Sequence, residues 1–333
     1  MAPFFFHLVY SQWFITPPLP QTTFAGKTAI VTGGNSGLGR EAAPHIVRLG
    51  ASRVIIAGRN PDALEEARQD IIATTGSSPE AIDTWQLDLC SYESVVSFAK
   101  RASTELSRLD IVLENAGMST AEFRMAERDE STITTNVVST LLLGLLLLPK
   151  LKDTVANFNT QPRISIVTSE THYFTTAASE RRALAEAKHR TLFEILSDPQ
   201  TANMKERYMV SKLLEILAVR EMMKSSAPPG YPVIINLVNP GFCYSNLTRE
   251  GPQVFMAIVR VLMHARSSEV GSRTLVHAAS AGEETHGTYL SDCKLSPVAD
   301  FVTSEAGREM QARVWNELIQ KLEDISPGVT KNL

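Results

Sequence analysis

Apolar segments as long as single β-strands alternate with amphipathic segments of helical length along most of this chain. Their nearly continuous apolar character is typical of parallel strands that are covered on both faces. This alternation predicts an α/β fold with one open, doubly wound parallel sheet flanked by helices. The strand-like segments cover residues 27–33, 53–58, 81–89, 109–115, 163–169, 232–239 and 287–291, and helical patterns cover 61–75, 92–105, 122–151 and 206–225.

The chain of 333 residues shows no internal repeat and no linker between two cores. We therefore expect a single domain over residues 25–333, preceded by an N-terminal extension at residues 1–24. The last third of the chain predicts additional helices around the ligand-binding end of the sheet. They are expected near residues 251–264, 268–282 and 304–323.

Composition excludes several classes of function. Hydrophobic residues make up 44% of the chain and charged residues 20%, which argues against extensive disorder. The formal net charge of −4 offers no basic field, so we expect no nucleic-acid partner. Cys90, Cys243 and Cys293 are too few for a disulfide framework and form no CxxC pair. We expect a cytoplasmic protein without a metal site.

The first sixteen residues are apolar and aromatic. His7 and Ser11 interrupt this segment and Pro17 follows it, so it is shorter than the roughly 20 apolar residues that span a bilayer. No basic stretch precedes it, which argues against a signal peptide. Two interpretations remain open: a lid packed on the domain surface, or peripheral membrane association through residues 1–16, where Trp13 favours an interfacial position.

A glycine-rich loop, TGGNSGLG at residues 32–39, follows the first predicted strand and opens a helix. Glycine allows sharp turns and close approach of the backbone to a ligand, and a helix N-terminus presents free N–H groups to an anion. In this position the loop predicts a binding site for the pyrophosphate of a dinucleotide. The residues expected to bind it are Gly33, Asn35, Ser36, Gly37, Leu38 and Gly39.

The end of the second predicted strand bears on cofactor preference. A site for NAD usually has an acidic residue there, whereas this chain has Arg59. An arginine offers a cation to a 2′-phosphate, and Arg40 is a second candidate for the same contact. The sequence therefore favours NADP(H) over NAD(H), unless Arg59 is a solvated loop residue.

Tyr208 and Lys212 lie four residues apart, on one face of a predicted helix. A phenol ionises near about pH 10, and a nearby ammonium group stabilises the phenolate and lowers its pKa. Ser169 ends a buried strand, at the edge where α/β proteins bind ligands, and Thr168 is an alternative hydroxyl. His172 either lines the substrate site or is a hydrogen-bonded loop residue.

In combination, these motifs resemble the short-chain dehydrogenase/reductase family over about residues 25–300. They are most similar to its retinol dehydrogenase-like and WW-domain oxidoreductase-like branch, which includes reductases of fungal secondary metabolism. The resemblance implies a Rossmann-type fold. The matching landmarks, in the order of the family, are the loop at 32–39, Asp88-Leu89, Asn115-Ala116-Gly117, Asn136, Ser169, Tyr208 with Lys212, and Pro240-Gly241.

The resemblance also implies an activity, the NADP(H)-dependent interconversion of a ketone or aldehyde with an alcohol. Tyr208 would be the general acid or base, and Ser169 would hydrogen-bond the carbonyl oxygen. Lys212 would lower the pKa of the tyrosine and hold the nicotinamide ribose. Asn136 would position a water that relays protons, although a surface position on its helix is an alternative.

Other cofactor contacts follow from the same resemblance. Asp88 would contact the adenine amine, unless it serves as a cap, and Asn115 would support the adenosine pocket. Leu89, Ala116 and Gly117 lie beside these two residues in the sequence. The resemblance implies that the nicotinamide is flanked by Pro240, Gly241 and Ser245.

This chain departs from the family pattern at several positions. Glu114 replaces the first asparagine of the usual Asn-Asn-Ala-Gly, and Ser245 stands where a threonine often follows the Pro-Gly turn. The inserted stretch at residues 180–205 predicts a helical flap beside the active site, which with residues 242–265 would set specificity. Glu206 and Arg207 predict a solvated helix start.

Two other functions remain open at this level. One is a regulatory protein that senses NADP(H) without catalysis, and the other is a membrane-associated retinoid or steroid dehydrogenase. Many relatives pair through their long helices, so a homodimer is expected by analogy. The partner expected for the site itself is a small carbonyl or alcohol substrate.

Overall fold

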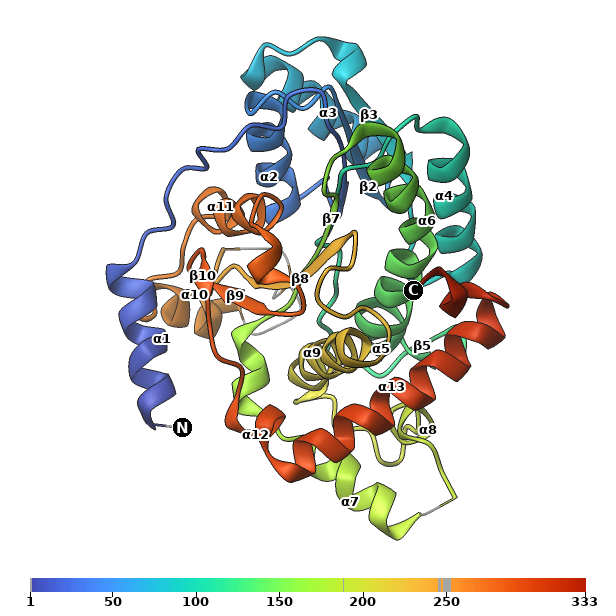
Figure 1. Cartoon of the computed structure of the whole chain (residues 1–333). Coiled ribbons are helices and arrows are strands. Elements are labelled where there is room, and N and C mark those ends of the chain that lie inside the picture. Colours follow the sequence, from blue (N-terminus) through green and yellow to red (C-terminus); the bar gives the residue numbers. More distant parts are fainter. Residues whose placement is uncertain (1, 188, 245–246, 248–252) are drawn as a thin grey trace.

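The computed structural model describes all residues except 1, 188, 245–246 and 248–252. In this part of the chain, an eight-stranded sheet has the order β10-β9-β8-β7-β4-β1-β2-β3 (Figure 1). All its pairings are parallel except that of β10 with β9. The predicted doubly wound α/β fold is confirmed. The strands are β1 Thr28–Thr32, β2 Arg53–Gly58, β3 Ile82–Gln86, β4 Ile111–Glu114, β7 Arg163–Val167, β8 Ile234–Asn239, β9 Tyr289–Ser291 and β10 Lys294–Leu295.

The order of the strands reverses at β1, which pairs with β2 on one side and β4 on the other. The chain therefore winds outward in opposite directions from this point. In open α/β sheets, ligands bind in the crevice outside the carboxyl ends of the strands at such a reversal. The topology places the glycine loop, which follows β1, at this position.

Helices cover both faces of the sheet and form two hydrophobic cores (Figure 1). Side chains of a strand alternate between faces, so Ala29 and Val31 of β1 join one core while Ile30 joins the other. The central strands β1, β2, β4, β7 and β8 are thus buried on both sides, which explains their continuous apolar sequences. The first core holds α4 Tyr92–Glu105, α6 Thr140–Phe158, α9 Arg207–Ser225 and α13 Glu305–Ile325; the second holds α2 Gly37–Arg48, α3 Pro61–Thr75 and α11 Ser268–Ala278.

The helix predicted over residues 122–151 begins later than expected. A hairpin of β5 Met125–Ala126 and β6 Asp129–Glu130 comes first. Glu130 then caps the helix, since its side chain accepts a hydrogen bond from Thr132 N. The helix continues through α5 Ser131–Ile133, a π-helical turn and α6 to Phe158. The span Ser131–Phe158 is apolar enough to cross a membrane, but 94% of its most apolar window is buried in the protein, as in a core helix.

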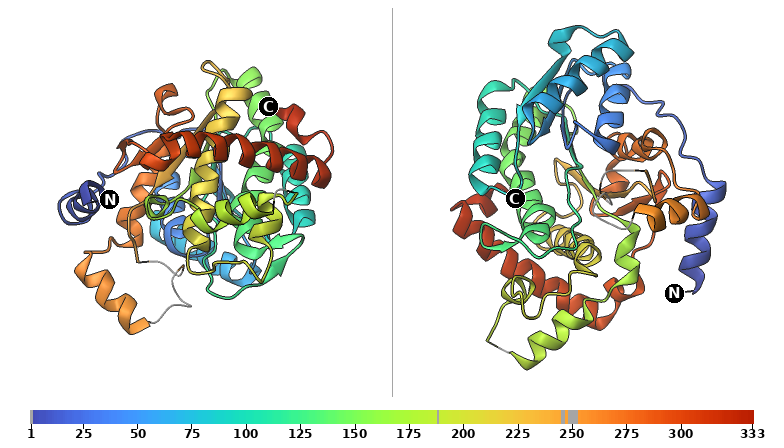
Figure 2. Two further views of the ribbon diagram at one scale, coloured as in Figure 1. Left: turned by 90° about the horizontal axis from the view of Figure 1, so that it is seen from below. Right: turned by 180° about the vertical axis from the view of Figure 1, so that it is seen from behind.

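The stretch at residues 180–205 is helical in part. It contains the end of α7 Ala178–Glu186 and all of α8 Leu192–Leu196. These helices lie beside α12 Asp300–Thr303 and α13 at one end of the molecule (Figure 2). The flap is tied to α13 because Arg313 donates a hydrogen bond to the carbonyl oxygen of Arg190 over 3.0 Å.

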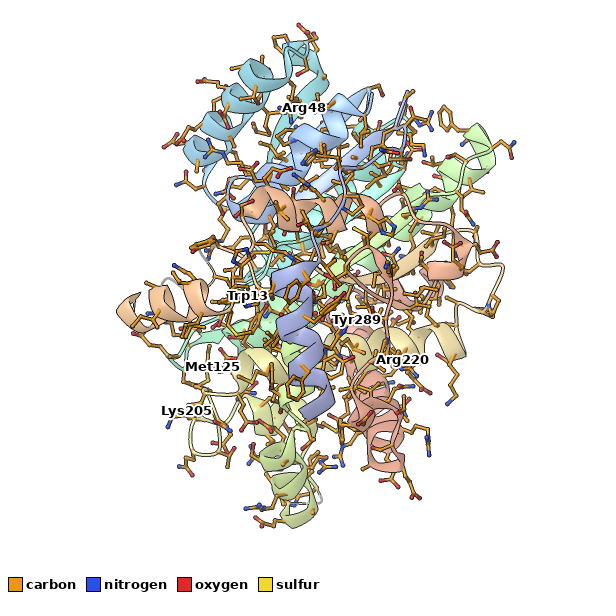
Figure 3. All side chains as sticks on the ribbon, turned by 90° about the vertical axis from the view of Figure 1, so that its left-hand side faces the viewer. Trp13, Arg48, Met125, Lys205, Arg220 and Tyr289 are labelled. Carbon is orange, nitrogen blue, oxygen red and sulfur yellow. The ribbon has the colours of Figure 1, made fainter. Side chains whose placement is uncertain are left out.

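The N-terminal extension forms α1 Ala2–Phe14 and an extended strap that ends at the buried Phe24. Leu8, Ser11 and Gln12 of α1 are buried against the domain, so the extension packs on its surface as the lid interpretation requires. Exposed aromatic side chains cover its outer face, and Trp13 stacks on His264 with ring centroids 5.0 Å apart (Figure 3). Membrane association through this face remains a prediction.

Candidate active site

The predicted site residues lie where the parallel strands end. Carboxyl ends of parallel strands share one edge of a sheet, so residues far apart in the sequence meet there. Helix α9 and the π-helical turn contain the other candidates, which are Tyr208, Lys212 and Asn136. Directly or shortly after β1, β2, β3, β4, β7 and β8 come, in that order, Gly33, Arg59, Asp88, Asn115, Ser169 and Pro240.

The glycine loop after β1 has no room for side chains at key positions. A Cβ atom on Gly39 would lie 2.6 Å from both Asn115 Nδ2 and the carbonyl oxygen of Gly33. Gly33 and Gly37 also have φ angles of +66° and +54°, a region that favours glycine. Asn115 Nδ2 donates to the carbonyl oxygen of Thr32 over 2.9 Å. Asn115 therefore holds the loop in place, in addition to its expected role beside the adenosine.

The helix that follows the loop presents an uncapped N-terminus. Ser36 is the N-cap residue of α2, but its side chain makes no capping hydrogen bond, and the first turn at 37–39 contains no acidic residue. The free N–H groups and the positive end of the helix dipole are thus directed at the loop. Asn35 lies against the end of β2, since a Cβ atom on Gly58 would be 2.9 Å from its Oδ1. This geometry fits a pyrophosphate.

The two arginines considered for the 2′-phosphate have different surroundings. Arg40 forms ion pairs with Glu66 at 3.4 Å and Asp70 at 3.3 Å, both on α3. Arg59 is exposed at the end of β2, and its guanidinium forms no hydrogen bond or ion pair with the described residues. Arg59 is therefore the cation that remains available for a ligand at this end of the site.

The loop after β3 contains Asp88 and Leu89. Asp88 Oδ1 accepts a hydrogen bond from Cys90 N over 2.9 Å, and its own amide donates to Ser94 Oγ over 2.9 Å. Leu89 is buried. Asp88 thus stabilises the turn before α4, whose N-cap is Ser91, so the capping alternative is wrong. Its predicted contact with adenine remains a prediction.

The turn after β4 lies against the helix that carries the lysine. Ala116 N donates to Thr32 Oγ1 over 2.9 Å, which links the turn to the end of β1. A Cβ atom on Gly117 would lie 3.3 Å from Asn136 Oδ1 and 3.8 Å from Lys212 Nζ. Glycine at this position leaves room for the Asn136 side chain, because only the 3.3 Å contact is closer than ordinary van der Waals distance.

The structure brings Ser169, Tyr208 and Lys212 together. The hydroxyl of Ser169 lies beside the phenol of Tyr208, close enough to lower its pKa. Lys212 Nζ lies 5.7 Å from the centroid of the Tyr208 ring, and it donates to the carbonyl oxygen of Val167 over 2.8 Å. One turn of α9 separates the tyrosine from the lysine and places them on the same face, as the sequence spacing predicts.

Burial and neighbouring charges set the pKa values of this pair. Burial raises the pKa of Tyr208; Lys212 and Ser169 lower it, Glu215 and Glu170 raise it, and the net shift is upward. Burial lowers the pKa of Lys212, but Glu215 and Tyr208 raise it, and its net shift is also upward. Lys212 thus acts on the phenol in the expected direction, but it does not outweigh burial and the carboxylates.

Two neighbours of Ser169 have structural contacts. The buried hydroxyl of Thr168 donates to the carbonyl oxygen of Lys212 over 3.3 Å, which leaves Ser169 as the hydroxyl beside the phenol. His172 is fully buried, with Nδ1 2.7 Å from Ser169 O, and its Nε2 accepts from Ala299 N over 3.2 Å. Burial lowers the pKa of His172 to about 4. It is a hydrogen-bonded loop residue.

Asn136 lies in the π-helical turn Thr134–Ser139 and is fully buried, so the alternative of a surface position is wrong. Its Oδ1 accepts from Met118 N over 2.9 Å. Its Nδ2 donates to Met118 O and to Ser211 Oγ, each over 2.9 Å. Asn136 therefore connects the turn after β4 to α9, next to Lys212. Such π-helical turns are frequent at functional sites.

The turn after β8 contains the residues expected to flank a nicotinamide. Gly241 has a φ angle of +80° and its amide donates to Asn239 Oδ1 over 3.2 Å. Arg266 Nη1 donates to the carbonyl oxygen of Pro240 over 3.1 Å. Ser245 lies outside the described residues, so its predicted contact stays a prediction.

Two charged residues near the site differ from what the sequence indicates. The predicted solvated helix start is wrong for Arg207, which is fully buried and pairs with the buried Glu130 at 3.3 Å. The hairpin that brings Glu130 there is distant in sequence. Glu215 was not among the predicted site residues, yet its Oε1 lies 2.7 Å from Lys212 Nζ. A spacing of three residues on one helix was the available signal.

Comparisons with known proteins agree with this geometry. A family model described as short chain dehydrogenase matches residues 27–171. The short chain dehydrogenase/reductase dmxR8 of Cryptosporiopsis sp. (strain 8999) is 46% identical over 328 residues, which cover 97% of this chain and 99% of that protein.

Two similar solved structures share the fold. One is a 3-oxoacyl (acyl-carrier-protein) reductase from Agrobacterium tumefaciens C58 with NADP bound, at a TM-score of 0.58 and 20% identity, covering 81% of this chain and 93% of that one. The other is L-sorbose reductase from Gluconobacter frateurii complexed with NADPH and L-sorbose, at a TM-score of 0.59 and 16% identity, covering 82% of this chain and 97% of that one. With the site and the sequence relatives, these likenesses lead to one conclusion: the chain belongs to the short-chain dehydrogenase/reductase family of oxidoreductases.

Proposed function

We propose that this chain is an NADP(H)-dependent oxidoreductase that interconverts a ketone or aldehyde with an alcohol. The observation that carries this proposal is the contact of the Tyr208 phenol with Ser169, beside the ammonium group of Lys212. This group lies at the sheet edge that also holds the glycine loop. NADP or NADPH in the two similar solved structures supports the same cofactor class.

The residues present fit a dinucleotide. The uncapped N-terminus of α2 suits the pyrophosphate, and Arg59 suits a 2′-phosphate. Asp88 and Leu89 with residues 115–117 would line the adenosine side. Pro240, Gly241 and Ser245 would flank the nicotinamide, which supplies or accepts the hydride when bound.

The residues of the chain would handle the proton. In reduction, the phenolic O–H bond of Tyr208 breaks as its proton passes to the carbonyl oxygen of the substrate. Ser169 donates a hydrogen bond to the same oxygen and stabilises the charge that develops there. The ammonium group of Lys212 stabilises the phenolate that remains. Oxidation of an alcohol runs through the same contacts in reverse, with the phenolate as base. Asn136 positions the turn beside Lys212.

Replacement of the acid tests this assignment. Tyr208→Phe removes the exchangeable proton with little change in shape, so kcat/KM for a carbonyl panel with NADPH should fall by about 10²–10⁴-fold. The dissociation constant of NADPH, measured by calorimetry, should change little. Tyr173→Phe is a matched control because the Tyr173 hydroxyl donates to the carbonyl oxygen of Pro297. Full activity of the Tyr208 variant would refute the proposal.

A further inference from the structure

A buried carboxylate lies directly behind the lysine of the site. Glu215 is three residues after Lys212 on α9, and its Oε1 is 2.7 Å from Lys212 Nζ. Both side chains are almost inaccessible to solvent, at 6% and 1% exposure. A lysine ammonium has three N–H donors. Glu215 and the carbonyl oxygen of Val167 take two of them, which leaves one for the site.

Glu215 is surrounded by few other polar groups. On its own helix its Oε1 accepts from Lys212, and its Oε2 has no hydrogen-bond partner among the described residues. From the end of β7 the Thr168 hydroxyl, which donates to the carbonyl oxygen of Lys212, lies close enough to lower the pKa of Glu215. From the end of β4 it faces Glu114, another buried carboxyl group, close enough that the charge of Glu215 affects its titration. Burial raises the pKa of Glu215, while Lys212 and Thr168 lower it, with a result of about 7.

Glu114, unlike Glu215, has no ion-pair partner among the described residues. It lines a cavity of about 10 Å³ with Gly144 and apolar side chains, and neither of its oxygens has a hydrogen-bond partner among the described residues. Burial raises the pKa of Glu114 well above its ordinary value, and Glu215 raises it further. The negative charge next to Lys212 is therefore that of Glu215, which is the group held by an ammonium.

We propose that Glu215 is a positioning residue for the Tyr208–Lys212 pair: its carboxylate holds Lys212 Nζ against the end of β7, beside the phenol, and supplies the negative charge that faces the pair. This inference rests on the proposed function. A negative charge at this position favours the protonated forms of both groups, as the upward contributions of Glu215 to the pKa values of Tyr208 and Lys212 indicate. The loss of the first proton from the pair therefore occurs at higher pH than it would without Glu215.

Glu215→Gln tests the proposal, because the amide keeps the volume and an acceptor for Lys212 but removes the charge. Carbonyl reduction needs the protonated phenol, so kcat/KM falls at alkaline pH. In the variant, this alkaline decline should move to lower pH by about one unit. Glu215→Asp keeps the charge, so its decline should stay near the wild-type pH while kcat falls. The ultraviolet absorbance that marks ionisation of Tyr208, obtained as the difference from the Tyr208→Phe variant, should appear at a pH that is lower by the same amount.

Two controls isolate the effect of the charge. Glu221→Gln is the same change on the same helix, at a carboxylate that binds Lys224 and Gln311 instead, and it should leave the profile unchanged. Glu114→Gln removes a neutral carboxyl and should also leave it unchanged. A folded Glu215→Gln variant with the wild-type profile would overturn the proposal, as would an equal shift in Glu221→Gln. Full activity of Tyr208→Phe would instead overturn the proposed function.

Discussion

Arg40 and Arg59 show how local charge decides what a residue can do. Arg40 follows the glycine loop and Arg59 follows the neighbouring strand β2, so the sequence makes each a candidate contact for a 2′-phosphate. In the structure the carboxylates of Glu66 and Asp70 hold Arg40. Arg59 is exposed at the end of β2, next to Asn35 and Gly58. We therefore propose that cofactor preference depends on Arg59.

Arg59→Asp should reverse the cofactor preference, because the carboxylate repels a 2′-phosphate and can accept hydrogen bonds from ribose hydroxyls. Loss of a charge-assisted contact worth about 1–3 kcal/mol lowers kcat/KM with NADPH by about 5–150-fold. Initial rates with NADPH and NADH on one carbonyl substrate measure this change. Arg59→Lys keeps the charge and should retain the preference. If Arg59→Asp discriminates between NADPH and NADH as the wild type does, another residue sets the cofactor preference.

Residues with a fixed spacing in the sequence are the ones that sequence analysis places best. Tyr208 and Lys212 are one helical turn apart, so their contact is local. Glu215 has a local signal too, but only the structure shows that it is buried and charged beside the lysine. Arg207 could not be predicted, because its partner Glu130 comes from a hairpin that the apolar pattern does not reveal.

At the scale of single elements, the ion pair of Arg207 with Glu130 joins the start of α9 to the start of the α5–α6 helix. Arg207 pairs with Glu130 at 3.3 Å and donates to the carbonyl oxygen of Leu196 over 2.7 Å. Glu130 caps α5 and is also fully buried. The contacts orient α9 directly before Tyr208, so they link the hairpin to the candidate site.

Arg207→Met should lower the free energy of unfolding by about 3–5 kcal/mol, because it leaves the Glu130 carboxylate buried without its partner. Urea denaturation followed by circular dichroism measures the change. Combining Arg207→Met with Glu130→Gln removes the unpaired buried charge, so the double variant should regain a large part of the lost free energy of unfolding. Arg101→Met breaks the exposed pair with Glu105 and should cost no more than about 1 kcal/mol. Equal losses for Arg101→Met and Arg207→Met would contradict this account.

For the whole molecule, alternating strands and helices were sufficient to predict the sheet, because its central strands are buried on both faces. The docking of the N-terminal helix was not predictable in detail. Arg266 Nη2 pairs with Asp292 at 2.5 Å and also donates to Ser11 Oγ over 3.1 Å and Ile15 O over 3.1 Å. Its Nη1 donates to Pro240 O. These partners lie up to 255 residues from Arg266 in the sequence, so no local pattern reveals them.

Arg266 thus holds α1 and the turn after β8 together, and Arg266→Gln should release the extension. Exposed Phe6, Tyr10 and Phe14 are sites for chymotrypsin, so cleavage before residue 15 should become about tenfold faster while the core stays intact. Limited proteolysis with mass spectrometry measures the rate. Arg273→Gln, which removes a contact with Pro17 O but none with the β8 turn, should have a smaller effect. Because the same arginine supports Pro240, a released extension should also raise the KM for the nicotinamide cofactor. An unchanged cleavage rate in Arg266→Gln would show that the apolar contacts of α1 suffice to hold it.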